Sequence, residues 1–326
     1  MPARLPALRF GLDHPVGEDA AALATFLAGA FGPATVAVIH YGSRAQGRPT
    51  RPDSAFDFFV VVDHYREAYT SLAASVGTAY SARTATFLAG ILAPNVIAVT
   101  EHAGDTERRA KCCVISLRDF RQACSPHPRD HFIQGRLIQF VVAAWTRDEP
   151  RAAAIAGAIA QARANTLAWV RPTLPDEFGV DEYVYAVLRR SLAGEIRPEA
   201  GDHARTLVTA QTETLHAIYR PLLAELARTG LLTISPRGET YRLRIPVGRW
   251  EAFRNRWYFR RSKIRTTTRL LKHVALYEGW LDYIVKKIDR SSGESIVLTP
   301  RERRWPLVFL WPKVFHYLRT RPQRRQ

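Results

Sequence analysis

Short β-branched runs alternate, over the first 116 residues, with longer segments in which apolar residues recur every three or four positions. The runs predict buried strands, and the helical spacing predicts amphipathic helices. The expected strands span residues 36–41, 58–62, 95–100 and 112–116, and the expected helices span residues 18–31 and 66–76. This alternation predicts an α+β fold with a mixed sheet and flanking helices.

The pattern becomes helical after residue 116. Helices are expected at residues 117–124, 130–145, 149–167, 180–192 and 204–228, with a break at Pro221 in the last of them. The segment LLTISPRGETYRLRI then alternates around a Pro-Arg-Gly turn, as a hairpin does. Helices followed by a hairpin predict a winged-helix-like domain. The expected domains are therefore residues 1–167 and 168–250, followed by a C-terminal segment of residues 251–326.

A Gly-Ser turn and a single carboxylate stand at the ends of two expected strands. Gly42 and Ser43 follow the first strand, and Asp57 directly precedes the second. Backbone N–H groups and a hydroxyl at such a turn suit a phosphate oxygen. A carboxylate that faces them suits Mg²⁺, which prefers oxygen ligands. Nucleotidyltransferases hold a triphosphate in this way.

The usual nucleotidyltransferase signature carries two aspartates one residue apart, and Ala55 stands here in place of the first. Magnesium keeps several waters and takes substrate phosphate as a ligand, so one carboxylate and the triphosphate can suffice. Asp53, Asp63 and Glu101 are the alternatives for a second protein ligand, since each is near the end of an expected strand. We interpret His40, which precedes the turn, as a core or strand-end residue.

The formal net charge of +17 is unevenly distributed. Residues 251–326 hold 19 Lys and Arg against 6 Asp and Glu, or +13, which leaves +4 for residues 1–250. Such a field attracts polyanions, either nucleic acid or an anionic lipid surface. The three cysteines form no C-x-x-C pair, which favours a reducing compartment and argues against a disulfide framework or a zinc site.

Basic and aromatic residues interleave after residue 250, and Trp305, Phe309, Trp311 and Phe315 recur near helical spacing. Aromatic rings flanked by Arg and Lys suit a membrane interface. The alternative is that these rings pack onto the main body as core. No apolar run reaches the length of a membrane span, so we expect a cytoplasmic protein, soluble or peripherally bound to a membrane.

An ordered series of short motifs connects these features. It runs from HYGSRAQG, through Asp57 before FFVVV, to KCCVI, IQGRL and LRRSLAGEIRPEAGD. Over residues 36–225 the order and spacing of this series resemble the peripheral, mitochondrial-type phosphatidate cytidylyltransferases, also called CDP-diacylglycerol synthases. Each motif is short, so the resemblance lies in their succession.

The resemblance implies a nucleotidyltransferase-like domain, then a winged-helix-like domain, and a Mg²⁺-dependent reaction of CTP with phosphatidate in a membrane surface. Gly42 and Ser43 would cradle the nucleotide phosphates. Asp57 would bind the metal, and Lys111 would neutralise phosphate charge.

Two basic positions, Arg136 and Arg197, match family-like segments and are assigned to the anionic substrate. Other functions stay open. The same fold would serve RNA, a protein side chain or a small molecule as acceptor, with the basic tail binding nucleic acid. With Ala55 in place of an aspartate, the chain would also suit a non-catalytic scaffold that binds membrane or nucleic acid.

Overall fold

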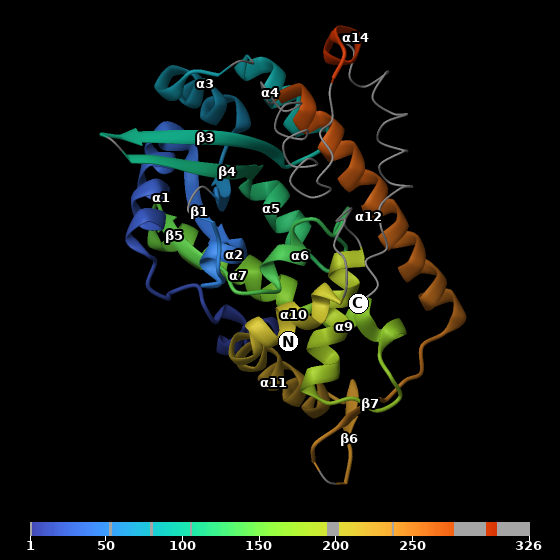
Figure 1. The fold of residues 1–326 in the computed structure, drawn as a ribbon. Helices are drawn as coiled ribbons and strands as arrows, with labels where there is room; N and C mark the ends of the chain where they lie inside the picture. Colours follow the sequence, from blue (N-terminus) through green and yellow to red (C-terminus); the bar gives the residue numbers. More distant parts are fainter. Residues whose placement is uncertain are drawn as a thin grey trace.

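The computed structural model describes residues 2–51, 54–78, 81–104, 106–193, 202–236, 238–276 and 298–304. A five-stranded mixed sheet lies between two layers of helices in the upper part of the molecule (Figure 1). Its strands follow the order β3-β4-β2-β1-β5 and comprise β1 (Thr35–Tyr41), β2 (Phe56–Val62), β3 (Asn95–Ala103), β4 (Thr106–Ser116) and β5 (Val142–Thr146). The chain is therefore an α+β protein with a mixed sheet, as the alternating pattern predicts.

β2 runs parallel to β4, and the other neighbouring pairs are antiparallel. One face of the sheet packs on α1 (Glu18–Ala30), α3 (Tyr65–Val76) and α4 (Ala82–Ile91). The opposite face packs on α5 (Leu117–Cys124), α6 (Gln134–Leu137) and α7 (Glu149–Ala164). Because alternate strand residues point to opposite faces, Cys112 lies in the first core and Cys113 in the second.

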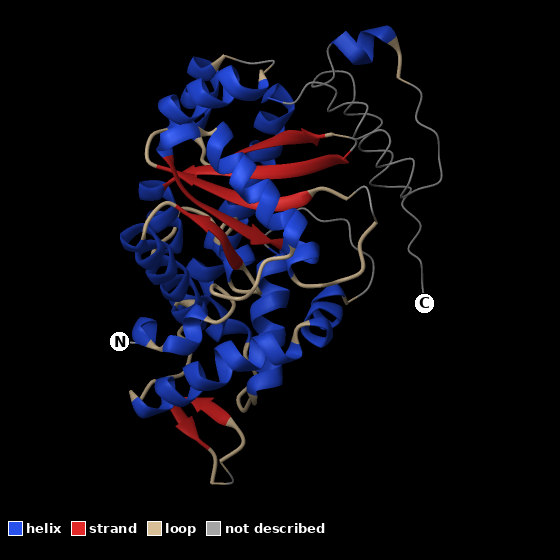
Figure 2. Cartoon of the chain, turned by 90° about the vertical axis from the view of Figure 1, so that its left-hand side faces the viewer, coloured by secondary structure: helices blue, strands red, loops and turns tan. Residues whose placement is uncertain are grey.

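A second, helical part lies below the sheet and ends in a two-stranded hairpin (Figure 2). Its core also takes in apolar residues of the chain start, including Leu8. The elements are η1 (Pro2–Arg4), η2 (Pro6–Arg9), α8 (Thr166–Val170), η4 (Arg171–Thr173), α9 (Val180–Ala193), α10 (His203–Ala210), α11 (Thr212–Arg228), β6 (Leu232–Ile234) and β7 (Tyr241–Leu243). The remaining short elements are η3 (Gly32–Ala34), α2 (Gly42–Ala45) and α14 (Pro300–Arg304).

The long helix α12 (Arg249–Leu276) spans both parts and ends beside α4 (Figure 1). Near its start, Asn255 donates to the Trp169 carbonyl, and Phe259 joins the core of the helical part. Farther along, Lys272 donates to the carbonyls of Leu88 and Pro94 beside the sheet. Within the described residues, no helix combines the length and the apolar character required to cross a bilayer.

Most predicted elements are present, but three predictions differ from the structure. The predicted helix at residues 130–145 is wrong, since only Gln134–Leu137 is helical and Val142–Thr146 forms β5. Pairing with β1, which joins His40 to Val142, satisfies the backbone of this stretch and completes the edge of the sheet.

The predicted break at Pro221 lies instead at Gln211, between α10 and α11. Apolar residues on both sides of Pro221, including Ile218 and Leu222, are buried in the core, and their burial offsets the roughly 3 kcal/mol cost of an interior proline. The strand expected at residues 112–116 begins earlier, at Thr106, so Lys111 lies within β4 and pairs with Ala98 of β3. Residues Trp305, Phe309, Trp311 and Phe315 lie outside the described chain.

A fully buried arginine, Arg163 on α7, connects the chain start to the end of α6 and the residues that follow it. Its guanidinium donates to the carbonyls of Leu8 and Phe10, at 2.9 and 2.8 Å, and to those of Leu137 and Gln139, at 2.9 and 2.8 Å. Burial lowers the pKa of Arg163 to about 10, so it remains charged at neutral pH. Four carbonyls that would otherwise lack partners are satisfied by one cation.

We expect Arg163→Met to lower the free energy of unfolding by roughly 3 kcal/mol or more, because it leaves four carbonyls of the interior without their donor. Urea unfolding followed by circular dichroism measures the change. Arg151→Met, on the same helix at a partly exposed position, is the control and is expected to change stability by less than about 0.5 kcal/mol. Equal stability of the two variants would contradict this role of Arg163.

Candidate functional site

A row of side chains crosses three neighbouring strands at the end of β1. Tyr41 pairs with Asp57 of β2, and Asp57 pairs with Lys111 of β4. Residues in register on adjacent strands share a face of the sheet, and this face is the one covered by α5, α6 and α7. The Lys111 Nζ atom lies 3.9 Å from Asp57 Oδ1, and the two side chains are 53% and 31% exposed. A ligand in solvent can therefore reach both charges.

Gly42 brings the turn after β1 against the Asp57 carboxylate. Its φ is +84°, a conformation that glycine adopts without steric cost. A Cβ atom built on Gly42 would lie 2.7 Å from Asp57 Oδ2, closer than non-bonded contact allows. The glycine thus permits both the turn and the close approach of the carboxylate. Ser43 follows in the short helix α2 and is partly exposed.

Arg136 of α6 adds a second cation on the same side of the sheet. Its guanidinium lies 3.8 Å from the centre of the Phe132 ring and donates to the Phe132 carbonyl. Burial raises the pKa values of Tyr41 and Cys113, and the positive charge of Arg136 opposes both increases. The Tyr41 hydroxyl and Cys113 Sγ are 3.2 Å apart. The positive charge of Arg136 therefore stabilises negative charge at these two buried groups, which lie on the same face of the sheet as Asp57.

Helix α12 contributes a second arginine that contacts the same aromatic ring as Arg136. Arg269 lies 4.5 Å from the centre of the Phe132 ring, so two guanidinium groups contact one aromatic side chain. Asp130 accepts hydrogen bonds of 2.9 Å from both Arg265 and Arg269. Burial acts to raise the pKa of Asp130, but the charge and hydrogen bonds of these arginines outweigh it, and the pKa lies below its usual value. Asp130 therefore stays ionised and holds α12 in place.

No local pattern in the sequence indicates Asp130, Phe132 or Arg269 as neighbours of the site, because Arg269 meets the other two from more than a hundred residues away. Arg44 of α2 directly follows the Gly-Ser turn, but its guanidinium lies 4.2 Å from the centre of the Phe56 ring, on the face of the sheet opposite Asp57.

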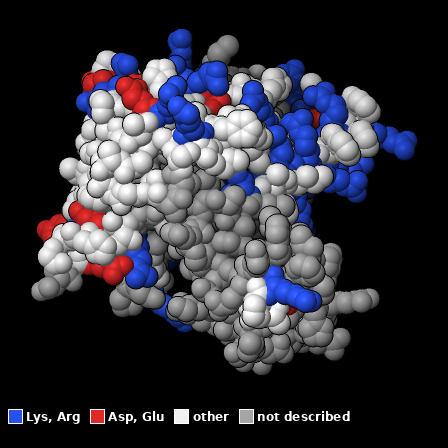
Figure 3. Space-filling model, turned by 90° about the horizontal axis from the view of Figure 1, so that it is seen from above, with Lys and Arg blue, Asp and Glu red and all other residues white. Residues whose placement is uncertain are grey.

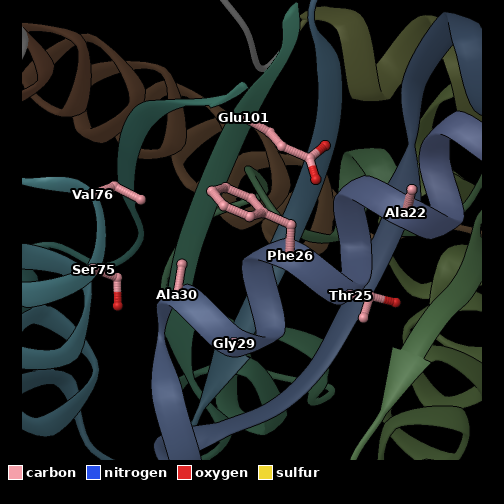
Figure 4. A pocket seen from close by; sticks show the side chains of 8 residues that line it. All are labelled: Ala22, Thr25, Phe26, Gly29, Ala30, Ser75, Val76 and Glu101. Atoms are coloured by element: carbon pink, nitrogen blue, oxygen red, sulfur yellow. The ribbon is translucent and has the colours of Figure 1, made fainter. Parts of the chain in front are cut away.

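The alternatives for a second carboxylate do not join Asp57 within the described chain. Asp63 lies beyond the opposite end of β2 and pairs with Arg147 at 2.8 Å. Glu101 pairs with Arg108 at 3.0 Å. Figure 4 shows Glu101 beside α1, on the face of the sheet opposite Asp57, at a hollow of about 600 Å³ that also contacts Phe26 and Val76. Asp53 and Arg197 lie outside the described residues.

His40 is a core residue, as the sequence interpretation holds. Its ring is buried among the rings of Phe56 and Phe58, with centroids 5.7 and 5.0 Å away, on the face opposite Asp57. Burial, reinforced by the charge of Arg44, lowers the pKa of His40 to about 4. A neutral imidazole facing the apolar core cannot exchange protons with a ligand beside Asp57.

A magnesium ion fits this row only in company with an anionic ligand. Within the described residues, no three His, Cys, Asp or Glu side chains gather closely enough to hold a metal by themselves. Asp57 supplies one carboxylate, with Lys111 beside it. Mg²⁺ accepts one or two carboxylates when substrate phosphates and water fill its other positions. The donor set therefore suits a metal that is bound together with a nucleotide.

No protein-family model matches the chain, and no curated protein matches it. The assignment of a function therefore rests on the geometry around Asp57 and on the succession of motifs along the chain.

Replacing Gly42 tests the contact between the turn and Asp57. Gly42→Ala is expected to displace the carboxylate and weaken binding of a Mg²⁺–nucleotide by about tenfold or more, measured by isothermal titration calorimetry. Gly47→Ala is a matched control, because Gly47 also has a positive φ of +63° but a Cβ there meets no atom within 4 Å. Both variants carry a strain of roughly 1–2 kcal/mol. Equal affinities would show that the contact is unimportant.

Burial of neutral His40 predicts a loss of stability in acid. The unfolded chain binds a proton near pH 6.5, whereas the folded chain does so only near pH 4. The free energy of unfolding should therefore fall as the pH decreases through this window, by up to about 3 kcal/mol from this residue. His40→Leu should remove that part of the fall. Urea unfolding at pH 7.0 and 4.5 gives the comparison, and an identical fall in the variant would refute it.

Proposed function

We propose that this chain is a nucleotidyltransferase that joins CTP and phosphatidate, giving CDP-diacylglycerol and pyrophosphate. The observation that carries the proposal is the convergence of Gly42, Asp57 and Lys111 on one exposed row. These residues come from three strands or their ends, and the resemblance assigns each of them to the nucleotide or its metal. The acceptor and the nucleotide base come from the resemblance alone.

The charges in the row suit two anionic substrates. Lys111 would offset charge on the nucleotide phosphates, and the backbone and hydroxyl of Gly42 and Ser43 would donate to phosphate oxygens. Mg²⁺, bound with the nucleotide and to Asp57, would polarise the phosphates as a Lewis acid. Arg136, partly exposed on the same face of the sheet, is the described candidate for the phosphate of the lipid. Arg197 keeps that assignment as a prediction.

The transfer needs no proton acceptor from the protein. An oxygen of the phosphatidate phosphate forms a bond with the α-phosphorus of CTP, while the bond from that phosphorus to the bridging oxygen breaks and pyrophosphate leaves. A phosphate monoester has a second pKa of about 6, so it is already ionised at neutral pH. Positioning and charge stabilisation are the main contributions of the protein to such a transfer, which agrees with the neutral, buried state of His40.

The domain assignments belong to the same proposal. The mixed sheet, with a Gly-Ser turn after β1 and Asp57 near the start of β2, supports a nucleotidyltransferase-like domain. Helices α9 to α11 followed by the β6–β7 hairpin support a winged-helix-like domain. A different acceptor, such as RNA, is the second candidate, and the +13 charge of residues 251–326 favours it. A non-catalytic scaffold is the third, favoured by Ala55 and by the single carboxylate of the row.

Pyrophosphate release tests the proposal. We expect the purified chain to release pyrophosphate from CTP when Mg²⁺ and phosphatidate vesicles are present, and more slowly from ATP, GTP or UTP. Asp57→Asn should lower the rate by about 100-fold or more, because it removes the carboxylate of the row. Glu101→Gln is the matched control, since this carboxylate lies on the opposite face of the sheet and should be dispensable.

Other outcomes decide between the candidates. Release with tRNA but not with phosphatidate would replace the acceptor and keep the transferase. No release with any nucleotide and either acceptor would support the non-catalytic scaffold. An unchanged rate of pyrophosphate release in Asp57→Asn would show that the reaction does not take place at the row around Asp57.

A further inference from the structure

The outer face of α12 carries a stripe of large apolar side chains. Trp250, Phe253, Trp257 and Ile264 are 68%, 49%, 60% and 66% exposed. At 3.6 residues per turn these positions fall within about 60° of one another around the helix, along about 21 Å of its axis. The rings of Trp250 and Phe253 stack, with centroids 5.4 Å apart. Several large apolar side chains exposed along one line of a helix indicate an interaction site.

The stripe lies opposite the face that anchors the helix. Phe259, Ser262 and Arg269 are buried on the inner face. Ser262 accepts a hydrogen bond from the backbone of His131, and Arg269 pairs with Asp130. The helix is thus attached to both parts of the molecule by one side and exposes its aromatic side. The exposed rings are therefore not needed to hold α12 in place.

Positive charge borders the stripe on both sides. Arg254 and Arg261 lie along one edge, and Arg256, Arg260 and Lys263 lie along the other; all five are exposed. From Arg249 to Arg269 the helix has one acidic residue, Glu251, which pairs with Arg171 at 3.3 Å. In Figure 3, blue side chains gather on the right, the side on which α12 lies in Figure 1. The partner of this face is therefore expected to carry negative charge.

The shape of the face favours a lipid surface over nucleic acid. Single-stranded nucleic acid binds in grooves, where bases stack on aromatic rings and basic side chains follow the phosphate backbone. The stripe, by contrast, lies on the convex outer surface of a single helix. Ile264 offers no ring for stacking. Aromatic residues along one line, with basic residues on each side, are typical of helices that lie in the plane of a bilayer at headgroup depth. The many charges of α12 agree with that position.

We propose that the outer face of α12 is a docking surface for an anionic phospholipid bilayer. The helix lies parallel to the bilayer plane, with Trp250, Phe253 and Trp257 among the headgroups and the flanking arginines and Lys263 paired with lipid phosphates. The inner face of the same helix carries Arg269, which shares the Phe132 ring with Arg136. Docking would therefore place the bilayer along the outer face of the helix whose inner face contacts the candidate site through Arg269 and Phe132.

Vesicle co-sedimentation of the full chain without nucleotide tests this surface. The unaltered chain should sediment with vesicles of phosphatidylcholine and phosphatidylglycerol, and weakly with phosphatidylcholine alone. Combined Trp250→Gln, Phe253→Gln and Trp257→Gln should weaken partitioning by about tenfold or more. The control combines Leu231→Gln, Ile234→Gln and Ile245→Gln, which removes three side chains of similar exposure at the β6–β7 hairpin and should leave binding unchanged.

A charge variant tests the basic borders independently. Combined Arg256→Gln, Arg260→Gln and Lys263→Gln, all exposed, should weaken binding to the anionic vesicles by about tenfold or more. Binding of the aromatic and charge variants at the level of the unaltered chain would overturn the proposal. Absence of vesicle binding, with binding of single-stranded RNA that the aromatic variant loses, would overturn it in favour of nucleic acid. Because no turnover is measured, the result is independent of the transferase proposal.

Discussion

One buried cation, Arg163, fixes the start of the chain against the backbone at Leu137 and Gln139. The guanidinium satisfies two carbonyls of the chain start and two more at Leu137, the last residue of α6, and Gln139. Tyr219 of α11 donates to the carbonyl between the latter two, at Ile138. The backbone just after Arg136 is thus held by side chains from both the sheet part and the helical part. Without these donors, a buried turn at this position would carry unpaired carbonyls.

This constraint determines where Arg136 lies. The four-residue helix α6 is too short to be stable alone, so its place on the sheet comes from the fixed segment after it and from the packing of Phe132 between two guanidinium groups. The second of these groups belongs to α12, which Asp130 anchors through ion pairs. The basic character of the row around Asp57 is therefore a product of the whole fold, assembled from a strand, a short helix and a distant long helix.

The row around Asp57 holds more cations than carboxylates, unlike a metal centre whose ligands all come from the protein. Lys111 stands in register with Asp57, and Arg136 lies on the same face, while Asp63 and Glu101 are paired with arginines elsewhere. A site in which cations outnumber carboxylates attracts phosphates directly, and a divalent ion adds to that attraction when it arrives with them. The same preference for anions recurs on the outer face of α12, although that face uses exposed rings and arginines rather than charges in register across a sheet.

The sequence by itself determined the elements whose signals are local. Buried runs such as residues 36–41 form strands, because only alternation buries β-branched residues on both faces of a sheet, and the positive φ at Gly42 follows from a glycine at a strand end. It also indicated Asp57 and, through the family resemblance, Lys111 as candidate site residues, which stay predictions. Only the tertiary structure decided that residues 142–146 form a strand and that Glu101 faces away from Asp57. It alone joined Asp130, Phe132 and Arg269. These outcomes depend on pairing across the sheet and on contacts between distant residues, and local patterns do not encode either.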